Sequence, residues 1–402
     1  MWKRWLFRAT DFQSLMYPCF ILCHIVGTFP YKIIASTFVA SKSRYILSTV
    51  IICVFCVLDL KYFYDVAIYK VINFKDVARN CDVMTFYTIC GFVIITTHVL
   101  SGHRMRLLQT IMKISSRLSP KSYNKLSRLI HAKDIIGFFY VIGLFSIYFN
   151  MVHMNIVYVI FTLYSVLHNF TMDMLYINCV CVLKACFEEI NNNLLHIKEF
   201  IVNNKLCVPI MFYYEQRNPF LIINLKALKK QHLMISDAVK MLNIIFSLQL
   251  LASIVLTFSG IIFGLYHHIV QYNRENGLFI KLDKKIGLIF VDTICYFIKM
   301  ALLAWACETG KNQAQEIRTT IHDVLNTSRD EQIKNELLLF SLQTLHCKNT
   351  FSAKGLNVDA TFLATMAGTI ATYMLILLQF LIISHPCDKK SAINSTMNNV
   401  IP

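Results

Sequence analysis

The chain has 402 residues, of which 56% are hydrophobic and 15% are charged, and its formal net charge is +16. Soluble globular proteins have about 45–50% apolar residues and about 25% charged ones. This composition excludes a disordered protein, a coiled coil and an ordinary soluble enzyme, and it predicts a helical membrane protein with several spans. The lysines and arginines lie between the apolar runs, which indicates a positive-inside bias and gives no reason to expect a nucleic-acid partner.

The first apolar stretch, Tyr17 to Ile34, differs from the later ones because it contains Pro18, Gly27 and Pro30. Proline and glycine both interrupt a regular helix. We therefore expect an interfacial or re-entrant segment here rather than a full span. The residues before it are charged and aromatic and show no small-residue cleavage pattern, so we expect no cleavable signal peptide.

Seven later runs are apolar over about 20 residues, the length that a helix needs to cross a hydrocarbon core of about 30 Å. These runs are Tyr45–Tyr64, Val83–Leu100, Ile135–Val152, Ile156–Val182, Ile244–Ile269, Ile286–Cys307 and Phe362–Ile383. The predicted fold is therefore all-α, with seven transmembrane helices. It divides into an N-terminal part over residues 1–44, six spans with their connections over 45–307, a polar segment over 308–361, and the last span with its tail over 362–402.

The basic residues distinguish the two sides of the predicted membrane. Residues 1–44, 101–134, 183–243 and 308–361 lie on one side and hold 28 lysines and arginines, whereas the segments on the opposite side hold 9. Because connections rich in Lys and Arg stay in the cytoplasm, this asymmetry predicts a cytoplasmic N-terminus and an extracellular C-terminus. A receptor coupled to G proteins has its N-terminus outside, so the charge pattern argues against that class.

The predicted cytoplasmic connections carry apolar residues at helical spacing. The stripes are Leu107, Leu108, Ile111, Ile114 and Leu118; Ile190, Leu194, Ile197 and Ile201; Leu225, Leu228, His232, Ile235, Val239 and Leu242; and Ile333, Leu337, Phe340, Thr344 and Cys347. Each stripe predicts a helix that buries one face, so we expect the spanning helices to continue into the cytoplasm and pack there as an anchor bundle. The position of His232 favours a hydrogen-bonded core histidine over a pH sensor. The segment from Cys207 to Pro219 breaks the pattern and predicts a loop.

Motifs of enzymes and metal sites do not stand out. No kinase, P-loop, G-x-G-x-x-G or H-E-x-x-H pattern occurs. Cys53 and Cys56 form a C-x-x-C pair, but they lie inside a predicted span without a second pair or a nearby histidine. A zinc or redox site needs accessible, polar thiolates. We therefore expect no metal, no cofactor and no enzyme activity, and we interpret the cysteines as small buried apolar residues.

The last span contains the most specific pattern, Thr372-Tyr373 followed by five apolar residues and Gln379-Phe380. It resembles the TYhhhhhQF signature of the insect gustatory receptor family, in which h is a hydrophobic residue, and it matches at all four named positions. Further segments that resemble this family are Phe340–His346, Phe351–Leu356, Ala306–Glu308 with Arg318–Thr319, and Gly27–Tyr31. The specific resemblance covers the C-terminal part of the chain, and elsewhere it lies in topology alone.

The spacing of the motif supports a role in a pore. Thr372, Leu375, Ile376 and Gln379 fall on one helix face. An amide deep in an apolar span costs a few kcal/mol unless it is paired or faces water. Four copies of Gln379 around an axis would meet this need, with Leu375 and Phe380 as a hydrophobic constriction. A hydrogen bond between helices of one subunit is the alternative. We expect the neighbouring tyrosine of the motif to pack against another helix.

The resemblance implies a tetrameric, ligand-gated, non-selective cation channel in the plasma membrane, with seven spans and cytoplasmic N-termini. Subunits of a homotetramer, or of a heterotetramer with related receptors, would be joined by the anchor bundle, and the last helix would line the pore. The ligand would be a small organic tastant, such as a sugar or a bitter compound. Gln379 stands where the sugar-receptor branch typically has Glu, which favours the bitter-type, fructose-type or orphan branches.

A ligand pocket is expected among the outer halves of the second to sixth spans. An aromatic cage with a few polar groups suits a small organic ligand. The candidate residues are Tyr87, Tyr148, His153, Tyr158, Tyr164, Tyr266, Asp292 and Tyr296. Plain helix packing is the alternative for each, and for Asp292 it is pairing with Lys299. We interpret Asp59, Lys61 and Asp173 as partners between helices or as residues near water.

Three other classes stay open. A metabotropic seven-span receptor would have an extracellular N-terminus. An odorant-type receptor usually lacks the pair Thr372-Tyr373. A transporter usually shows internal repeats, and we find none in the sequence.

Overall fold

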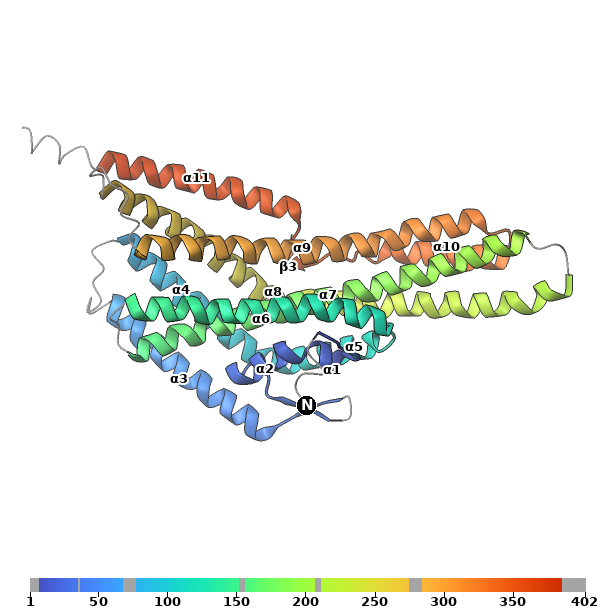
Figure 1. Cartoon of the computed structure of the whole chain (residues 1–402), viewed down its shortest axis with the longest axis horizontal. Helices are drawn as coiled ribbons and strands as arrows, with labels where there is room; N and C mark the ends of the chain where they lie inside the picture. Colours follow the sequence, from blue (N-terminus) through green and yellow to red (C-terminus); the bar gives the residue numbers. More distant parts are fainter. Residues whose placement is uncertain are drawn as a thin grey trace, which may run out of the picture.

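The computed structural model of the chain describes residues 7–34, 37–67, 77–151, 156–206, 211–274 and 284–384. These residues are mostly helical (Figure 1). The helices are α1 (Phe12–Leu15), α2 (Tyr17–Val26), α3 (Lys42–Ala67), α4 (Val77–Val99), α5 (Ser101–Ser115), α6 (Pro120–Met151), α7 (Ile156–Leu206), α8 (Met211–Arg274), α9 (Lys284–Thr327), α10 (Glu331–His346) and α11 (Ala360–Ser384). The strands β1 (Tyr31–Ile34) and β2 (Thr37–Ala40), and β3 (Ser352–Ala353) and β4 (Leu356–Asn357), form two antiparallel hairpins.

The predicted all-α membrane fold is confirmed. Within the described residues, α3, α4, α6, α7, α8 and α11 each contain a stretch that is long and apolar enough to cross a membrane. The remaining predicted run, Ile286–Cys307, lies in the first half of α9. The helices extend beyond the predicted runs. For example, α6 begins at Pro120, well before the predicted start at Ile135.

The stretch Tyr17–Ile34 folds into a short helix and a strand rather than one span. Pro18 lies in the first turn of α2, where its missing N–H is not needed. The helix ends at Gly27, whose φ of 77° is the left-handed conformation that glycine adopts at little cost. The chain then turns into β1, in which Tyr31 pairs with Ala40 of β2. The position of this segment relative to a bilayer stays a prediction.

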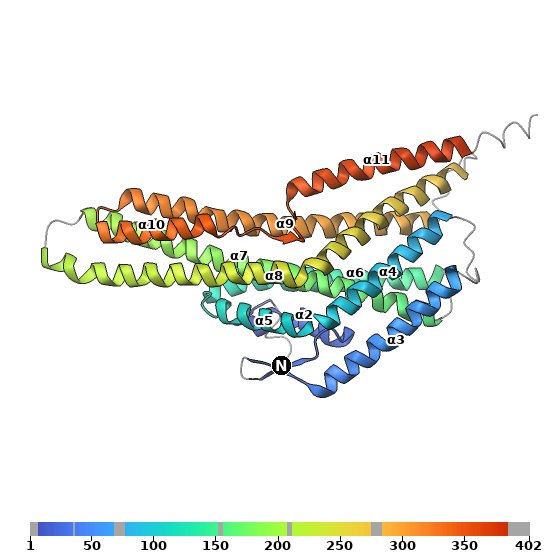
Figure 2. The same cartoon turned by 180° about the vertical axis from the view of Figure 1, so that it is seen from behind.

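Three helices are much longer than a bilayer is thick. α7 has 51 residues, α8 has 64 and α9 has 44. At a rise of 1.5 Å per residue they measure about 77, 96 and 66 Å. Figures 1 and 2 show their ends running side by side with α10, as a bundle at one end of the molecule. We call this bundle the extension; it comprises residues 183–206, 211–243, 308–327 and 331–346.

The apolar stripes of the extension are confirmed as its core at most positions, and Thr344 and Cys347 are only half-buried. Ile190, Leu194, Leu225 and Leu337 are all buried in one hydrophobic cluster that joins the four helices. The stripe of α5 belongs to the same cluster, which fixes that helix against α7 and α8. The bundle predicted beyond the membrane therefore exists, and its position in the cytoplasm stays a prediction.

His232 is a hydrogen-bonded core histidine, as the sequence predicts. Its side chain is fully buried, and its Nδ1 lies 3.1 Å from Nε2 of Gln343. The rings of Phe187 and Phe340 pack against it with centroids 5.9 and 5.5 Å away. His232 lies outside the predicted span of α8, and burial lowers its pKa to about 4. The imidazole is therefore neutral at pH 7.

The predicted loop from Cys207 to Pro219 is wrong in its second part, because α8 already begins at Met211 and contains Pro219. A proline in a helix interior costs about 3 kcal/mol. The three buried leucines that follow, Leu221, Leu225 and Leu228, stabilise the helix by about 1.5–3 kcal/mol each. Packing therefore outweighs the breaker. Residues 207–210 lie outside the described part of the chain.

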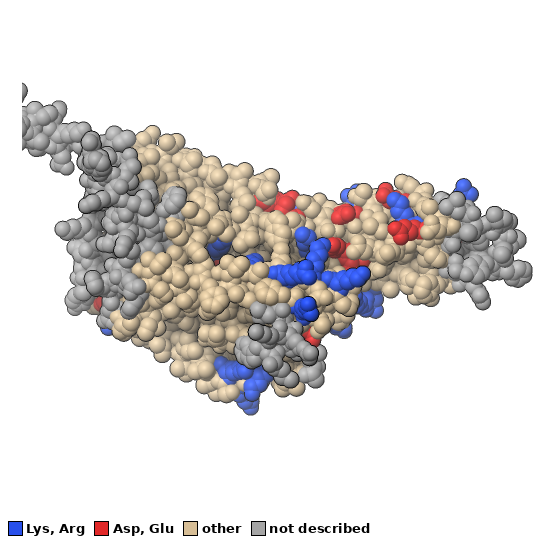
Figure 3. All heavy atoms as spheres, viewed as in Figure 1, with Lys and Arg blue, Asp and Glu red and all other residues tan. Residues whose placement is uncertain are grey.

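Charged side chains avoid one half of the molecular surface. On the face in Figure 3, they gather from the middle of the molecule toward the α10 end, whereas the described surface on the α11 side is almost free of them. On α3 the outward residues include Ile46, Leu47, Val54 and Leu60, all more than half exposed. Such a surface suits hydrocarbon rather than water. We call this half the membrane end; it comprises α3, α4, residues 135–151, 156–182, 244–274 and 284–307, and α11.

Candidate functional site

The last helix, α11, is attached to the rest of the molecule along one face. Met366, Ile370 and Met374 recur every four residues and are buried, where α11 packs on α8 and α9. In Figure 1 the helix lies at the edge of the molecule, beside these two helices. Its start is fixed by Asp359, which accepts a hydrogen bond from the N–H of Phe362 at 3.1 Å. Asp359 also forms an ion pair with Lys311 of α9 at 3.4 Å. The helix is therefore anchored at its first turn and open along its far side.

The open side of α11 carries the predicted pore residues. Thr372, Leu375, Ile376 and Gln379 are all exposed, and Leu375 is 62% exposed. Thr372 donates its hydroxyl proton to the carbonyl of Gly368 at 2.9 Å. The four residues share one face, as their spacing predicts, and that face is directed away from α8 and α9. The side chain of Phe380 lies outside the described residues. An exposed amide in hydrocarbon costs several kcal/mol, so this face requires water or another protein surface.

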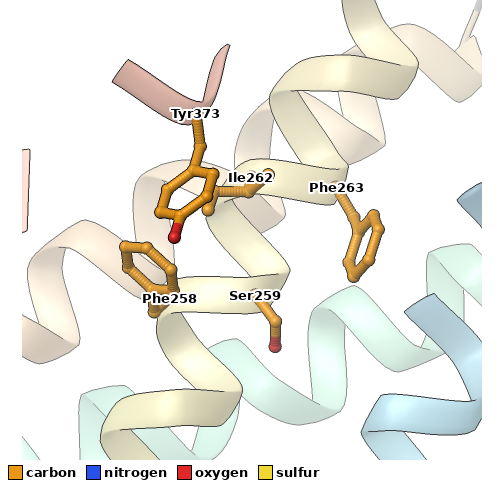
Figure 4. Close-up of a pocket in the computed structure, with 5 residues that line it drawn as sticks. All are labelled: Phe258, Ser259, Ile262, Phe263 and Tyr373. Carbon is orange, nitrogen blue, oxygen red and sulfur yellow. The ribbon is translucent and has the colours of Figure 1, made fainter. Parts of the chain in front are cut away.

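Tyr373 packs against a neighbouring helix, as expected. Its ring meets that of Phe258 of α8 edge to face, with centroids 6.1 Å apart. Phe258, Ser259, Ile262, Phe263 and Tyr373 surround an open pocket of about 180 Å³ between α8 and α11 (Figure 4). The four α8 residues belong to a run that is apolar on all sides, so nothing in the sequence distinguishes them from their neighbours.

Three of the predicted ligand residues, Tyr87, Tyr158 and Tyr164, come together between α3, α4 and α7. They belong to a second hydrophobic cluster that also contains Phe55 and Phe161. The Tyr87 hydroxyl lies 2.6 Å from the Thr162 hydroxyl. Tyr158 donates a hydrogen bond to Asp65 at 2.9 Å, and Tyr164 donates one to the carbonyl of Val26 at 3.3 Å. These internal contacts show how the rings join the helices. A role in ligand binding stays a prediction for each.

The remaining candidates belong to other helices. Tyr296 of α9 lies against Gly260 of α8, where a Cβ atom would come within 2.7 Å of the ring. Gly260 therefore permits the close approach of α8 and α9. Tyr266 of α8 packs on the ring of its neighbour His267, with centroids 5.8 Å apart. His153 and the side chains of Tyr148 and Asp292 lie outside the described residues.

A buried ion pair links three helices of the membrane end. Asp173 of α7 contacts the amine of Lys299 of α9 at 2.6 Å and accepts a hydrogen bond from Ser253 of α8 at 2.9 Å. The side chains of Asp173 and Lys299 are 5% and 20% exposed. The prediction that Asp173 is a partner between helices is confirmed, and its partner is the lysine considered for Asp292. A carboxylate in a span indicates function or a specific partner, and here the partner is visible.

A second carboxylate approaches a glycine. The Asp59 side chain of α3 reaches α4 at Gly91, where an added Cβ would lie 2.6 Å from its Oδ2. Any larger residue than glycine at this position would displace the carboxylate. Asp59 and Asp173 therefore both face other helices.

A family model for 7tm chemosensory receptors matches residues 16–383 of the chain. Two proteins of Drosophila melanogaster, named as gustatory receptors 28b and 28a, are similar in sequence. The first is 29% identical over 153 residues, which cover 37% of this chain and 32% of that protein. The second is 26% identical over 176 residues, which cover 43% of this chain and 39% of that protein. The matched segments thus span less than two fifths of the length of these relatives.

The fold is similar to solved structures of the insect olfactory receptor OR5 from Machilis hrabei. One has a TM-score of 0.69 at 10% sequence identity. Another, a complex with eugenol, has a TM-score of 0.65 at 12% identity. Each match covers 92% of this chain and 98% of the other. At this level of identity the likeness concerns the fold alone.

Proposed function

The chain belongs to the 7tm chemosensory receptor family, and on this basis we propose that it is a gustatory receptor that acts as a ligand-gated cation channel. A small organic tastant binds among the outer halves of the spans, and the pore is lined by α11 from four subunits. One observation carries the proposal: Thr372, Leu375, Ile376 and Gln379 form an uncovered face on a helix of the membrane end.

The amide on this face of α11 limits what can cover the face. A purely apolar surface could face lipid, but the amide of Gln379 could not do so without losing several kcal/mol of hydration. Around a fourfold axis the amides meet water and one another, while Leu375 and Ile376 narrow the path. A narrow apolar ring excludes water when closed and admits ions when it widens. Outward movement of α11 then opens the channel.

Assembly and orientation follow from charge and from the extension. The excess of lysines and arginines on one side supports a cytoplasmic N-terminus and a cytoplasmic extension in the plasma membrane. On α10, large apolar residues point away from the core of the subunit and are about half exposed; they are Leu338, Leu339, Leu342 and Leu345. A stripe of this kind in water favours contact with another subunit. The extension therefore joins the subunits of the tetramer.

The proposed ligand class rests on the relatives named as gustatory receptors and on the intact Thr372-Tyr373 pair. Both favour a tastant over an odorant. Opening requires that the ligand binds the open state more tightly than the closed one, typically by about 1–3 kcal/mol per coupled site.

The test is to express the full chain in cells, apply panels of sugars and bitter compounds, and record currents. Currents that persist in excised patches without nucleotides are expected of a channel and contradict a G-protein-coupled receptor. Replacement of Gln379 with Ala is expected to change the ratio of basal to evoked current about tenfold, which corresponds to about 1.4 kcal/mol. The matched control is Gln332→Ala, which removes an exposed amide from the first turn of α10. If Gln379→Ala and Gln332→Ala give the same ratio of basal to evoked current, α11 does not line the pore.

A further inference from the structure

The junction between α4 and α5 contains a buried guanidinium group. Arg104 is 2% exposed, and its Nη1 donates a hydrogen bond to the carbonyl of Thr97 at 3.1 Å. Its central carbon lies 5.1 Å from the ring centre of Phe246 of α8. Its Nε and Nη2 atoms have no hydrogen-bond partner in the described part of the chain. Two strong donors are therefore buried without an acceptor.

Other polar atoms near this arginine lack partners as well. His168 of α7 is 1% exposed, lies within electrostatic reach of Arg104, and has no described partner for either ring nitrogen. The hydroxyl of Thr97 is also unpaired among the described residues. So is the side-chain oxygen of Gln249, one helical turn after Phe246. Arg104 contacts Thr97 and Phe246 directly and lies within electrostatic reach of His168, so these residues belong to the same junction of α4, α5, α7 and α8.

The cluster is positively charged. The groups that act electrostatically on Arg104 are Cys23, Tyr31 and Cys179, and no described carboxylate is among them. Burial lowers the pKa of Arg104 to about 10, so the guanidinium remains protonated. A buried charge without an opposite charge beside it costs several kcal/mol. A negatively charged group that accepts several hydrogen bonds would therefore stabilise the buried guanidinium.

We propose that Arg104, His168 and Thr97 bind a small inorganic anion, such as chloride, inside the junction of α4 and α5. Arg104 offers the N–H groups of Nε and Nη2, Thr97 offers its hydroxyl, and the imidazole of His168 offers an N–H. A small ion fits better than a lipid headgroup, because the three side chains are each at most 2% exposed and leave no path for attached acyl chains. The bound ion holds the junction where α4 ends and α5 begins. This site is independent of the proposed channel function.

Direct binding provides the first test. The full chain is purified in neutral detergent, and equilibrium binding of radiolabelled chloride is measured. The wild type is expected to bind chloride saturably at one site per subunit. Arg104→Met keeps an apolar stem against Phe246 and is expected to lower the affinity at least about tenfold. The matched control, Arg106→Met, changes an exposed arginine two residues away and is expected to leave binding intact.

The second test measures the stability of the wild type, so it can be made even if Arg104→Met does not fold. The unfolding temperature of the wild type is expected to rise with chloride when gluconate balances the ionic strength, and the rise is expected to shrink in Thr97→Val. Absence of chloride binding by the wild type, or equal binding by Arg104→Met, would overturn the proposal. If the unfolding temperature rises with added phosphatidylserine and not with chloride, the bound negative charge belongs to a lipid, and the proposal of a small inorganic anion is overturned.

Discussion

The two ends of the molecule use apolar side chains in opposite ways. In the apolar stretch of α3, at the membrane end, only 17% of the residues are buried inside the chain. In the extension, α10 buries Ile333, Leu337 and Phe340 and turns charged residues such as Glu331 outward. Lipid accepts an apolar outer face and water does not. A membrane span is therefore recognised in the sequence by the length of its apolar run. A helix of the extension is recognised by the regular spacing of its apolar residues.

The two ends also differ in how they use charge. At the membrane end the ion pair of Asp173 and Lys299 is buried between helices. In the extension, pairs such as Lys198 with Asp323 are largely exposed, with 34% and 52% of the side chains accessible. Buried pairs are costly to break and exposed pairs contribute little. The same substitution should therefore have very different effects at the two ends.

The largest effect is expected at the buried pair. Lys299→Met leaves Asp173 without its cationic partner and is expected to lower the free energy of unfolding by about 3–5 kcal/mol. The unfolding temperature of the purified chain measures this loss. Lys198→Met, the matched change in the extension, is expected to cost less than about 1 kcal/mol. Replacing both members, as Asp173→Leu with Lys299→Met, should recover much of the loss. If both lysine variants behave alike, the contrast in charge between the two ends is wrong.

A second comparison concerns two adjacent leucines of α10. Leu337 is fully buried, whereas Leu338 is 47% exposed. Leu337→Ala is expected to cost about 2–5 kcal/mol because it leaves a cavity, and Leu338→Ala is expected to cost under about 0.5 kcal/mol in a single subunit. Thermal unfolding measures both, together with the oligomeric state by mass photometry. A large loss for Leu338→Ala with dissociation of the assembly would show that a second subunit covers the stripe.

The smallest effect is expected from pH in the extension. His232 has a pKa of about 4 in the folded state, whereas an unfolded histidine titrates near 6.5. The unfolded state therefore binds more protons between these values, and stability is lost as pH falls through this window, by about 1.4 kcal/mol per unit at most. His232→Gln should flatten this part of the stability profile. The same change at His196, which is 77% exposed, should leave the profile as it is.

Much of the architecture could be predicted from sequence, for a physical reason that also sets the limit. Run length fixes where a span lies, and spacing fixes which residues share a face, so the exposed face of α11 was predictable. Neither fixes the rotation of one helix against another. The pairing of Asp173 with Lys299, and the contact of Arg104 with Phe246, depend on that rotation and join residues far apart in the chain. The helical course through Pro219 was missed because a local signal was outweighed by distant packing.

The unbroken course of α9 has a mechanical consequence. The helix holds Lys299 at the membrane end and Ile317 and Ile321 in the core of the extension. A stiff rod of about 66 Å that tilts by about 5° displaces one tip relative to the other by about 6 Å. A slight reorientation near the ion pair would thus be magnified into a shift of a full helical turn at the opposite tip, without any joint along the way.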